Sequence, residues 1–201
     1  MEIIAHRINN IEELINVPTD YGIEVDLRDY GERLILQHDP FKDGEDFEEY
    51  LKYYNHGTII LNIKSERIEF RVIDLIIKYK VKDYFFLDCS FPMIYLLSEQ
   101  GEKNIALRFS EFEAIDTILN MKGKINWVWL DCLTRLPIDR NSYELLKSAG
   151  YKICLVSPDL LDRKDSISKY KKYRFEYLFS MPWAREDWMN MMLSEKPRGW
   201  I

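Results

Sequence analysis

The sequence has 201 residues, of which 47% are hydrophobic, and carries a formal net charge of −6 at pH 7. That length and apolar content suffice for one domain with a sizeable core, so we predict a single domain over residues 1–201. The acidic balance argues against general nucleic-acid binding, which needs a basic patch, and no apolar run approaches the length of a transmembrane helix.

Strand-like and helix-like segments alternate from one end of the chain to the other. Short apolar runs predict strands, and amphipathic stretches that begin at a capping residue or end at glycine predict helices. The main strands are predicted at 3–7, 22–28, 58–64, 84–89, 104–109, 125–130, 152–156 and 176–179, with an extra extended segment at 33–38. Helices are predicted at 10–16, 45–54, 65–81, 93–99, 113–121, 139–149, 166–173 and 185–193.

Eight strands that alternate with helices imply a parallel sheet, and the count of eight points to a compact, single-domain (β/α)8 TIM barrel of the α/β class. A doubly wound open sheet is the alternative architecture. No Gly-x-Gly-x-x-Gly follows the first strand, which argues against a dinucleotide-binding fold. In a barrel the carboxyl ends of the strands converge on one face, where active sites are built. A set of polar residues at these ends supports the barrel: His6, Glu24, Asp26, Lys64, Asp88, Arg108, Asp131, Ser157 and Ser180.

The segment 22–28 alternates strictly between apolar and charged residues, which indicates a strand with two different faces. Glu24 and Asp26 are one strand repeat apart, so their carboxylates point to the same side and could share a hard cation. The alternative is a polar face that pairs with Arg28. Two histidines, His6 and His38, follow strand-like runs on either side of this pair, where they could exchange protons with a substrate.

These residues resemble the glycerophosphodiester phosphodiesterase family, one of the phosphatidylinositol-phospholipase-C-like phosphodiesterase barrels. The match in spacing and strand placement covers three motifs: His6-Arg7, Glu24-x-Asp26 and His38-Asp39. Asn62-x-Lys64 falls where the family has Glu-x-Lys on the third strand, and Ser90-Phe91 resembles the family's Ser-Phe after the fourth. The resemblance is specific over roughly residues 1–65, weaker to about residue 92, and topological afterwards.

The resemblance implies metal-assisted cleavage of a phosphodiester in a small, glycerophosphodiester-like molecule. The implied roles are acid/base catalysis for His6 and His38, binding of a divalent cation (Mg²⁺ or Ca²⁺) for Glu24, Asp26 and Asn62, and binding of phosphate oxygens for Arg7 and Lys64. Such a reaction must neutralise charge on the phosphate oxygens, activate a nucleophile and protonate the leaving alkoxide. The nucleophile is either water or a neighbouring hydroxyl of the substrate, which would give a cyclic phosphate.

The sequence departs from the family pattern at several places. Asn62 stands where the family has its third metal-binding carboxylate, so the cation would be held by less charge, although amide oxygens also bind Mg²⁺ and Ca²⁺. Ile8 replaces the glycine after His-Arg, and the usual Glu-Asn-Thr segment is missing. The eighth strand ends in Ser180, Met181 and Pro182, where many relatives carry Thr-Asp.

Further residues are assigned to the substrate side of the pocket. Arg108 and Asp131 lie at the ends of the fifth and sixth predicted strands, and we predict that they bind substrate or phosphate, with ion pairs at the barrel end as the alternative. Lys64 has a similar alternative, an ion pair with Glu66. Trp129 shares a strand face with Asp131 and is expected to pack there, with a place at the pocket mouth as the alternative.

We therefore predict a phosphoric diester hydrolase of lipid metabolism that uses Mg²⁺ or Ca²⁺ and a small-molecule phosphodiester. No signal peptide opens the chain and its three cysteines lie in apolar runs without metal spacing, so we expect a cytoplasmic location and reduced thiols. Two alternatives stay open. One is a catalytically silent barrel that binds a phosphorylated sugar or lipid headgroup, and the other is a lyase or phosphotransferase. The cluster of Trp188, Met189, Met191 and Met192 is assigned to the core, with a homodimer patch as the alternative.

Overall fold

The computed structural model describes residues 1–161, 170 and 173–180. In this part of the chain the strands form one ten-stranded sheet. Two short strands, β3 (Arg33–Leu36) and β4 (Glu45–Asp46), extend β2 in antiparallel fashion. The other strands pair in parallel: β1 (Glu2–Ala5), β2 (Gly22–Tyr30), β5 (Ile59–Ile63), β6 (Tyr84–Leu87), β7 (Ala106–Phe109), β8 (Trp127–Leu130), β9 (Lys152–Val156) and β10 (Tyr177–Ser180).

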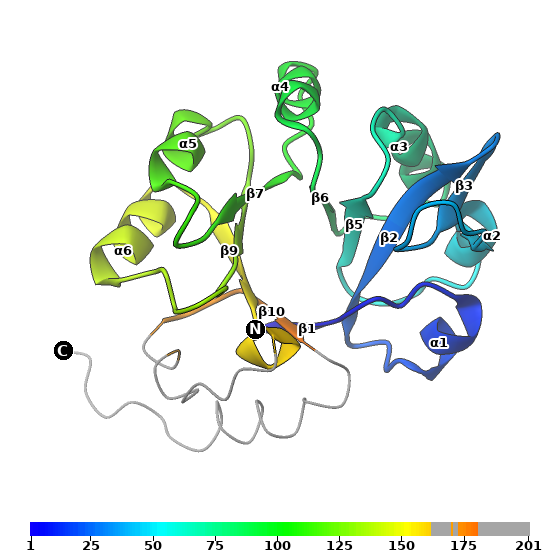
Figure 1. Cartoon of the computed structure of the whole chain (residues 1–201), viewed down its shortest axis with the longest axis horizontal. Helices are drawn as coiled ribbons and strands as arrows, with labels where there is room; N and C mark the ends of the chain where they lie inside the picture. The colour runs from blue at the N-terminus through cyan, green and yellow to red at the C-terminus, as the bar shows by residue number, and fades with distance from the viewer. Residues whose placement is uncertain (162–169, 171–172, 181–201) are drawn as a thin grey trace.

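The parallel strands pair in the series β6-β5-β2-β1-β10-β9-β8-β7. Figure 1 shows that this series curls around a common centre with the helices outside it. The two ends of this series, β6 and β7, meet among the described residues at one isolated bridge, between Phe86 and Ile105. Beside the bridge, the Phe86 amide donates a 2.8 Å hydrogen bond to the Asn104 carbonyl. The predicted α/β class and curled parallel sheet are thus confirmed, while closure of the barrel is limited to this one bridge.

Short helices follow most of the parallel strands. They are α1 (Ile11–Asn16), α2 (Phe47–Leu51), α3 (Glu69–Lys78), α4 (Phe91–Glu99), α5 (Ile115–Asn120), α6 (Arg140–Ser148) and the 3₁₀ helix η1 (Pro158–Leu161). Two predicted caps are present, because the Asn10 side chain accepts the Glu13 amide and the Asp139 side chain accepts the Ser142 amide, both at 2.8 Å. No helix among the described residues is long and apolar enough to cross a membrane.

Two helices are much shorter than the sequence predicts. The predicted helix at 45–54 reduces to α2, because Glu45 and Asp46 pair with β3 as strand β4. The predicted helix at 65–81 begins only at Glu69, because Arg67 has a φ of 70°, which a right-handed helix does not accept. The segments predicted as helices at 166–173 and 185–193, the latter with its Trp and Met cluster, lie wholly or largely outside the described residues.

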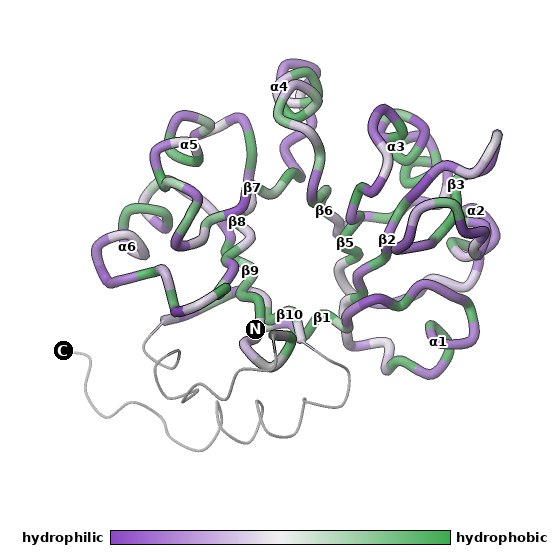
Figure 2. Tube along the Cα trace, viewed as in Figure 1, coloured by the Kyte–Doolittle hydropathy of each residue, from purple (hydrophilic) through white to green (hydrophobic). Residues whose placement is uncertain are grey.

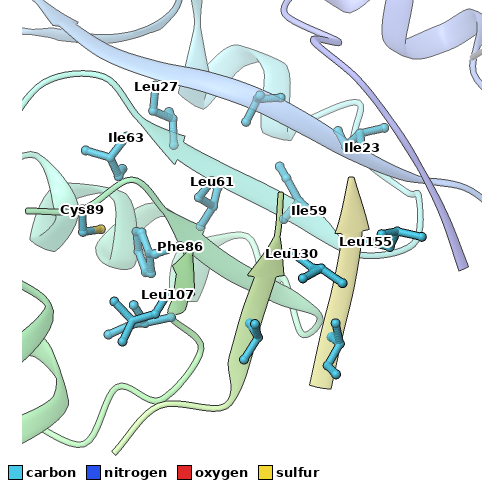
Figure 3. Close-up of a cluster of buried hydrophobic side chains, with 14 of the residues drawn as sticks. Ile23, Leu27, Ile59, Leu61, Ile63, Phe86, Cys89, Leu107, Leu130 and Leu155 are labelled. Atoms are coloured by element: carbon cyan, nitrogen blue, oxygen red, sulfur yellow. The ribbon is translucent and has the colours of Figure 1, made fainter. Parts of the chain in front are cut away.

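The curled sheet has one apolar layer on each side. The outer layer lies between sheet and helices and takes alternate residues of each strand, as Figure 3 shows for Ile23 and Leu27 of β2 and Leu61 of β5. Figure 2 shows hydrophobic and hydrophilic residues mixed around each helix, as expected when only one helix face packs on this layer. The inner layer consists of Ile4, Ile60, Phe85, Leu87, Ala106, Trp127, Trp129, Cys154, Val156 and Phe179.

This alternation determines where the polar residues of the strands point. Because Ile23, Val25 and Leu27 belong to the outer layer, Glu24 and Asp26 face the inside of the curled sheet. At the amino ends of the strands the inside is filled by aromatic rings, and Trp127 stacks on Phe85 with ring centroids 4.2 Å apart. The polar residues therefore gather at the carboxyl ends.

Candidate active site

A pocket of about 260 Å³ lies at the carboxyl ends of the parallel strands. The structure brings every residue that the sequence nominated for the site to this one pocket. The lining residues are His6, Arg7, Glu24, Asp26, His38, Asn62, Lys64, Leu87, Arg108, Trp129, Asp131, Val156, Leu160 and Phe179. One half of the lining is mostly charged and lies at the ends of β1, β2, β3 and β5. The other half combines aromatic and aliphatic side chains with the ion-paired Arg108 and Asp131.

His6 and Arg7 follow the last residue of β1. The His6 ring is more than half buried and meets the Phe179 ring edge-on, with centroids 5.0 Å apart. Burial, and then the charge of Arg7, lower the pKa of His6 from 6.5 to about 4, so the ring is neutral near pH 7 in this site. Arg7 has a φ of 53°, a strained value for a residue with a side chain, and its amide is held by the Glu24 carboxylate at 2.8 Å.

Glu24 is fully buried beneath this turn. Its Oε2 accepts the Arg7 amide and its Oε1 accepts the Asn62 side-chain amide, each at 2.8 Å. Burial, and then the nearby Asp26 carboxylate, raise the pKa of Glu24 to about 7. Glu24 therefore links three elements, β1, β2 and β5, at the base of the pocket.

Asp26 is equally buried and is held by a residue that the sequence analysis did not nominate. The Asn9 side chain donates to Asp26 Oδ2 and accepts the Asp26 amide, both at 2.8 Å. This pair of bonds fixes the carboxylate so that only Oδ1 lacks a hydrogen bond, and the Lys64 ammonium lies 3.4 Å from that atom. Lys64 is also 3.7 Å from Asp88, so it forms ion pairs with Asp26 and Asp88 rather than with Glu66.

The oxygen atoms at this position suit a hard divalent cation. Among the described residues, no group of three His, Cys, Asp or Glu side chains forms a metal site. Glu24 and Asp26 supply two carboxylates here, and the third oxygen donor is the side-chain amide of Asn62. The buried Oδ1 atoms of Asp26 and Asn62 have no hydrogen-bond partner among the described residues. Two carboxylates and an amide oxygen are ligands that Mg²⁺ and Ca²⁺ accept, so the residues present fit such an ion.

His38 lies at the end of the β3 hairpin and has a partner at each ring nitrogen. Arg7 Nη2 lies 2.7 Å from Nε2, and Asp39 Oδ1 lies 2.9 Å from Nδ1. Pairing of Arg28 with Glu24 and Asp26 was the alternative for these acids, but the Arg28 side chain donates instead to the His38 carbonyl at 3.0 Å. This bond helps to hold the histidine at the pocket.

The far side of the pocket is organised around Arg108. Its Nε and Nη2 donate to the two carboxylate oxygens of Asp88 at 2.7 and 2.8 Å, and its Nη1 donates to Asp131. Burial lowers the pKa of Arg108, but these bonds outweigh it and hold the group charged. Trp129 Nε1 donates to the other Asp131 oxygen at 3.0 Å, so Trp129 both packs and lines the pocket. The structure therefore shows the ion pairs that were the alternative for Arg108 and Asp131. Both residues also line the pocket.

Sequence reasoning missed Asn9 and the partner of His38. Asn9 is three residues beyond His6 and could be nominated only by knowing that the chain turns back over β2 there. Asp39 is visible in the sequence as part of His38-Asp39, but its contact with the histidine ring depends on the loop conformation. The apolar lining residues Leu160 and Val156 carry no sequence signal that separates them from core residues.

Comparison with known proteins gives matches at the level of structure. No family model matches the chain, and no curated protein is significantly similar to it in sequence. Two solved chains provisionally assigned as glycerophosphodiester phosphodiesterases have TM-scores of 0.69 to it. One, from Agrobacterium tumefaciens, is 12% identical, with 97% of this chain and 99% of that chain covered. The other, from Galdieria sulphuraria, is 16% identical, with 94% and 97% covered.

A glycerophosphoryl diester phosphodiesterase from Parabacteroides distasonis is a further match. It is 11% identical, with 98% of this chain and 89% of that chain covered, at a TM-score of 0.65. Similarity over nearly the full length at these scores shows a shared fold. The chain thus shares its overall fold with solved glycerophosphodiester phosphodiesterases, the family whose motifs its sequence resembles.

Proposed function

We propose that the protein is a phosphoric diester hydrolase that acts on a small, glycerophosphodiester-like molecule with the help of Mg²⁺ or Ca²⁺. The observation that carries this proposal is the meeting of two histidines, two basic side chains (Arg7 and Lys64) and a buried carboxylate pair in one pocket. The shared fold with solved glycerophosphodiester phosphodiesterases supports it. We take the curled sheet, with its bridge between β6 and β7, to be a closed (β/α)8 barrel of compact size.

The charged half of the pocket is suited to a phosphate group. Arg7 is about half exposed and Lys64 is partly exposed, so both can reach substrate oxygens. Glu24, Asp26 and Asn62 would hold the cation. When bound, the cation would neutralise charge on the phosphate oxygens. Asn9 would keep Asp26 in the orientation that leaves its Oδ1 atom available.

The two histidines are suited to the proton transfers. Nε2 of His38 is an acceptor in this structure, which suits a base that takes the proton of the nucleophile. His6 is neutral near pH 7 because burial and the Arg7 charge lower its pKa. A bound phosphate would offset that charge and favour the protonated ring, which could then donate to the leaving alkoxide. Water or a neighbouring substrate hydroxyl would serve as the nucleophile.

One observation favours the alternative of a silent binding protein. Asn62 donates to Glu24 where a third carboxylate would strengthen a cation site, and Glu24 has a pKa near 7. Such a pocket would bind a cation less tightly than one with three acids, and without the cation it would still hold a phosphorylated headgroup through Arg7 and Lys64.

Turnover of a panel of phosphodiesters, headed by glycerophosphodiesters, tests the proposal. We expect cleavage with Mg²⁺, Ca²⁺ or Mn²⁺, loss of cleavage with chelator, and a fall of about 100-fold or more in kcat/KM for His6→Ala and for His38→Ala. His56→Ala is the matched control, because His56 contacts the Val17 carbonyl and does not line the pocket. No turnover with any cation, from protein shown to be folded, would favour the binding alternative.

A further inference from the structure

The contacts of His38 define which of its ring nitrogens carries the proton. An arginine guanidinium can only donate hydrogen bonds, so Nε2, which lies 2.7 Å from Arg7 Nη2, must accept. A neutral imidazole has one N–H, which is then on Nδ1 and donates to Asp39 Oδ1 at 2.9 Å. The partners on the two sides of the ring agree on one tautomer.

Asp39 is itself held in place. Its second carboxylate oxygen accepts a hydrogen bond from the Lys42 ammonium at 2.7 Å, and its amide donates to the Gln37 side chain at 3.1 Å. The hydrogen bonds from Lys42 and His38 lower the pKa of Asp39 to about 2, so the carboxylate is ionised at any pH where the protein would act. It does not line the pocket and would not touch a substrate there.

We propose that Asp39 is a positioning residue, which fixes His38 as the Nδ1–H tautomer and keeps its Nε2 turned toward Arg7 and the phosphate site. Arg7 Nη2 donates to that nitrogen, so an anion that draws the guanidinium away frees Nε2 when substrate arrives. The Nε2 lone pair then forms a bond to the proton of the nucleophile's hydroxyl, whose O–H bond breaks. The resulting imidazolium keeps its Nδ1–H bond to the Asp39 carboxylate, which stabilises the new charge. This catalytic consequence rests on the proposed function, whereas the tautomer does not.

Asp39 has few contacts, so a substitution there can distinguish positioning of His38 from a general structural role. Among the described residues, its carboxylate accepts hydrogen bonds only from His38 and Lys42, and its side chain is about half exposed. Replacing it with asparagine removes one charge and keeps the shape of the side chain. Asp43, four residues later, is a matched control, because it is also exposed and also pairs with a base, Arg33, without contacting His38.

The test compares Asp39→Asn, Asp39→Glu and Asp43→Asn. The first readout is the ¹⁵N chemical shifts of the histidine ring nitrogens, which report the tautomer and are tractable because the chain has three histidines. We expect His38 of the unchanged protein and of Asp43→Asn to be Nδ1–H, and Asp39→Asn to gain the Nε2–H form. The second readout is turnover, for which we expect kcat to fall about tenfold or more in Asp39→Asn with little change in KM, and to recover in part in Asp39→Glu.

Two results would overturn the proposal. One is a His38 tautomer that is the same in Asp39→Asn as in the unchanged protein, and the other is an equal effect of Asp43→Asn. Because the ring nitrogen signals need no turnover, a protein without phosphodiesterase activity would still show whether Asp39 sets the tautomer. Failure of the proposed function and failure of this inference are therefore distinguishable.

Discussion

At the scale of the residue, the pocket gathers charges whose burial is costly unless each finds a partner. Glu24 and Asp26 find theirs in the Arg7 amide, Asn62, Asn9 and Lys64. Every carboxylate oxygen of Glu24 and Asp26 accepts a hydrogen bond from one of these partners, except Asp26 Oδ1. That oxygen and Oδ1 of Asn62 are the atoms on which the cation proposal depends.

Asn62→Glu tests the cation proposal directly. A third carboxylate adds negative charge among the oxygen donors, so we expect the affinity for Mn²⁺, used as a probe, to rise about tenfold or more. Calorimetric titration of the folded protein measures this without any need for turnover. Asn62→Gln is the control, because it keeps the side chain neutral. Equal Mn²⁺ affinities in Asn62→Glu and the unchanged protein would contradict a cation site at this position.

His6 provides a pH-dependent prediction for stability. Its pKa is about 4 in the folded protein against an ordinary value of 6.5, so between these pH values the unfolded chain binds a proton that the folded chain does not. The stability that His6 contributes is therefore complete above pH 6.5 and is lost as the pH falls toward 4. Glu24 acts in the opposite direction, because its raised pKa costs stability as the pH rises from 4.5 to 7.

Comparison with His6→Gln separates the two effects, since Glu24 is present in both proteins. We expect the urea midpoint of the unchanged protein to fall more between pH 7 and pH 4.5 than that of His6→Gln. Equal losses in the two proteins would show that His6 is not desolvated as the structure indicates.

At the scale of the element, the weakest backbone junction of the sheet is between β6 and β7. Only the bridge of Phe86 with Ile105 joins them among the described residues. Side chains strengthen this junction at the carboxyl ends, where Arg108 of β7 holds Asp88 just after β6 and Asp131 just after β8. The ion-paired cluster therefore serves the sheet as well as the pocket.

Arg108→Met tests this structural role. Removing the guanidinium leaves Asp88 with the weaker ion pair to Lys64 and the buried Asp131 with the hydrogen bond from Trp129, so we expect a loss of about 1–3 kcal/mol in the free energy of unfolding. Urea unfolding measures the loss. Arg135→Met is the control, because Arg135 is exposed and its hydrogen bond to Glu111 is made by the backbone amide. An equal, small effect of both substitutions would contradict the role of Arg108 at the junction.

The elements also show what a sequence can predict. The strands are predicted well because their apolar runs are buried in the outer and inner layers. The helices α1 and α6 are predicted well because the Asn10 and Asp139 side chains cap them. Helix starts without such a signal are misplaced, as at 65, where the positive φ of Arg67 delays α3 to Glu69. In the pocket, residues at strand ends are predictable from topology, whereas Asn9 is brought to Asp26 by a loop whose path the sequence pattern does not contain.

At the scale of the whole molecule, the alternation of strand residues between two sides of the sheet explains how the chain buries a charged site. Strand residues of one parity build the outer apolar layer, and those of the other parity build the inside of the curled sheet. Inside, rings such as Phe85 and Trp127 fill the amino end, which leaves the carboxyl end to the polar set. The same arrangement of fold is shared with solved glycerophosphodiester phosphodiesterases at 11–16% identity.

The phosphodiesterase proposal can be tested by ³¹P NMR of a glycerophosphodiester incubated with the protein and Mg²⁺ or Ca²⁺. We expect that the diester signal is replaced by a phosphomonoester signal, that chelator prevents this, and that His38→Ala abolishes it. An unchanged diester signal with every cation would contradict the phosphodiesterase itself, and a cyclic phosphate as the final product would contradict hydrolysis in favour of a lyase.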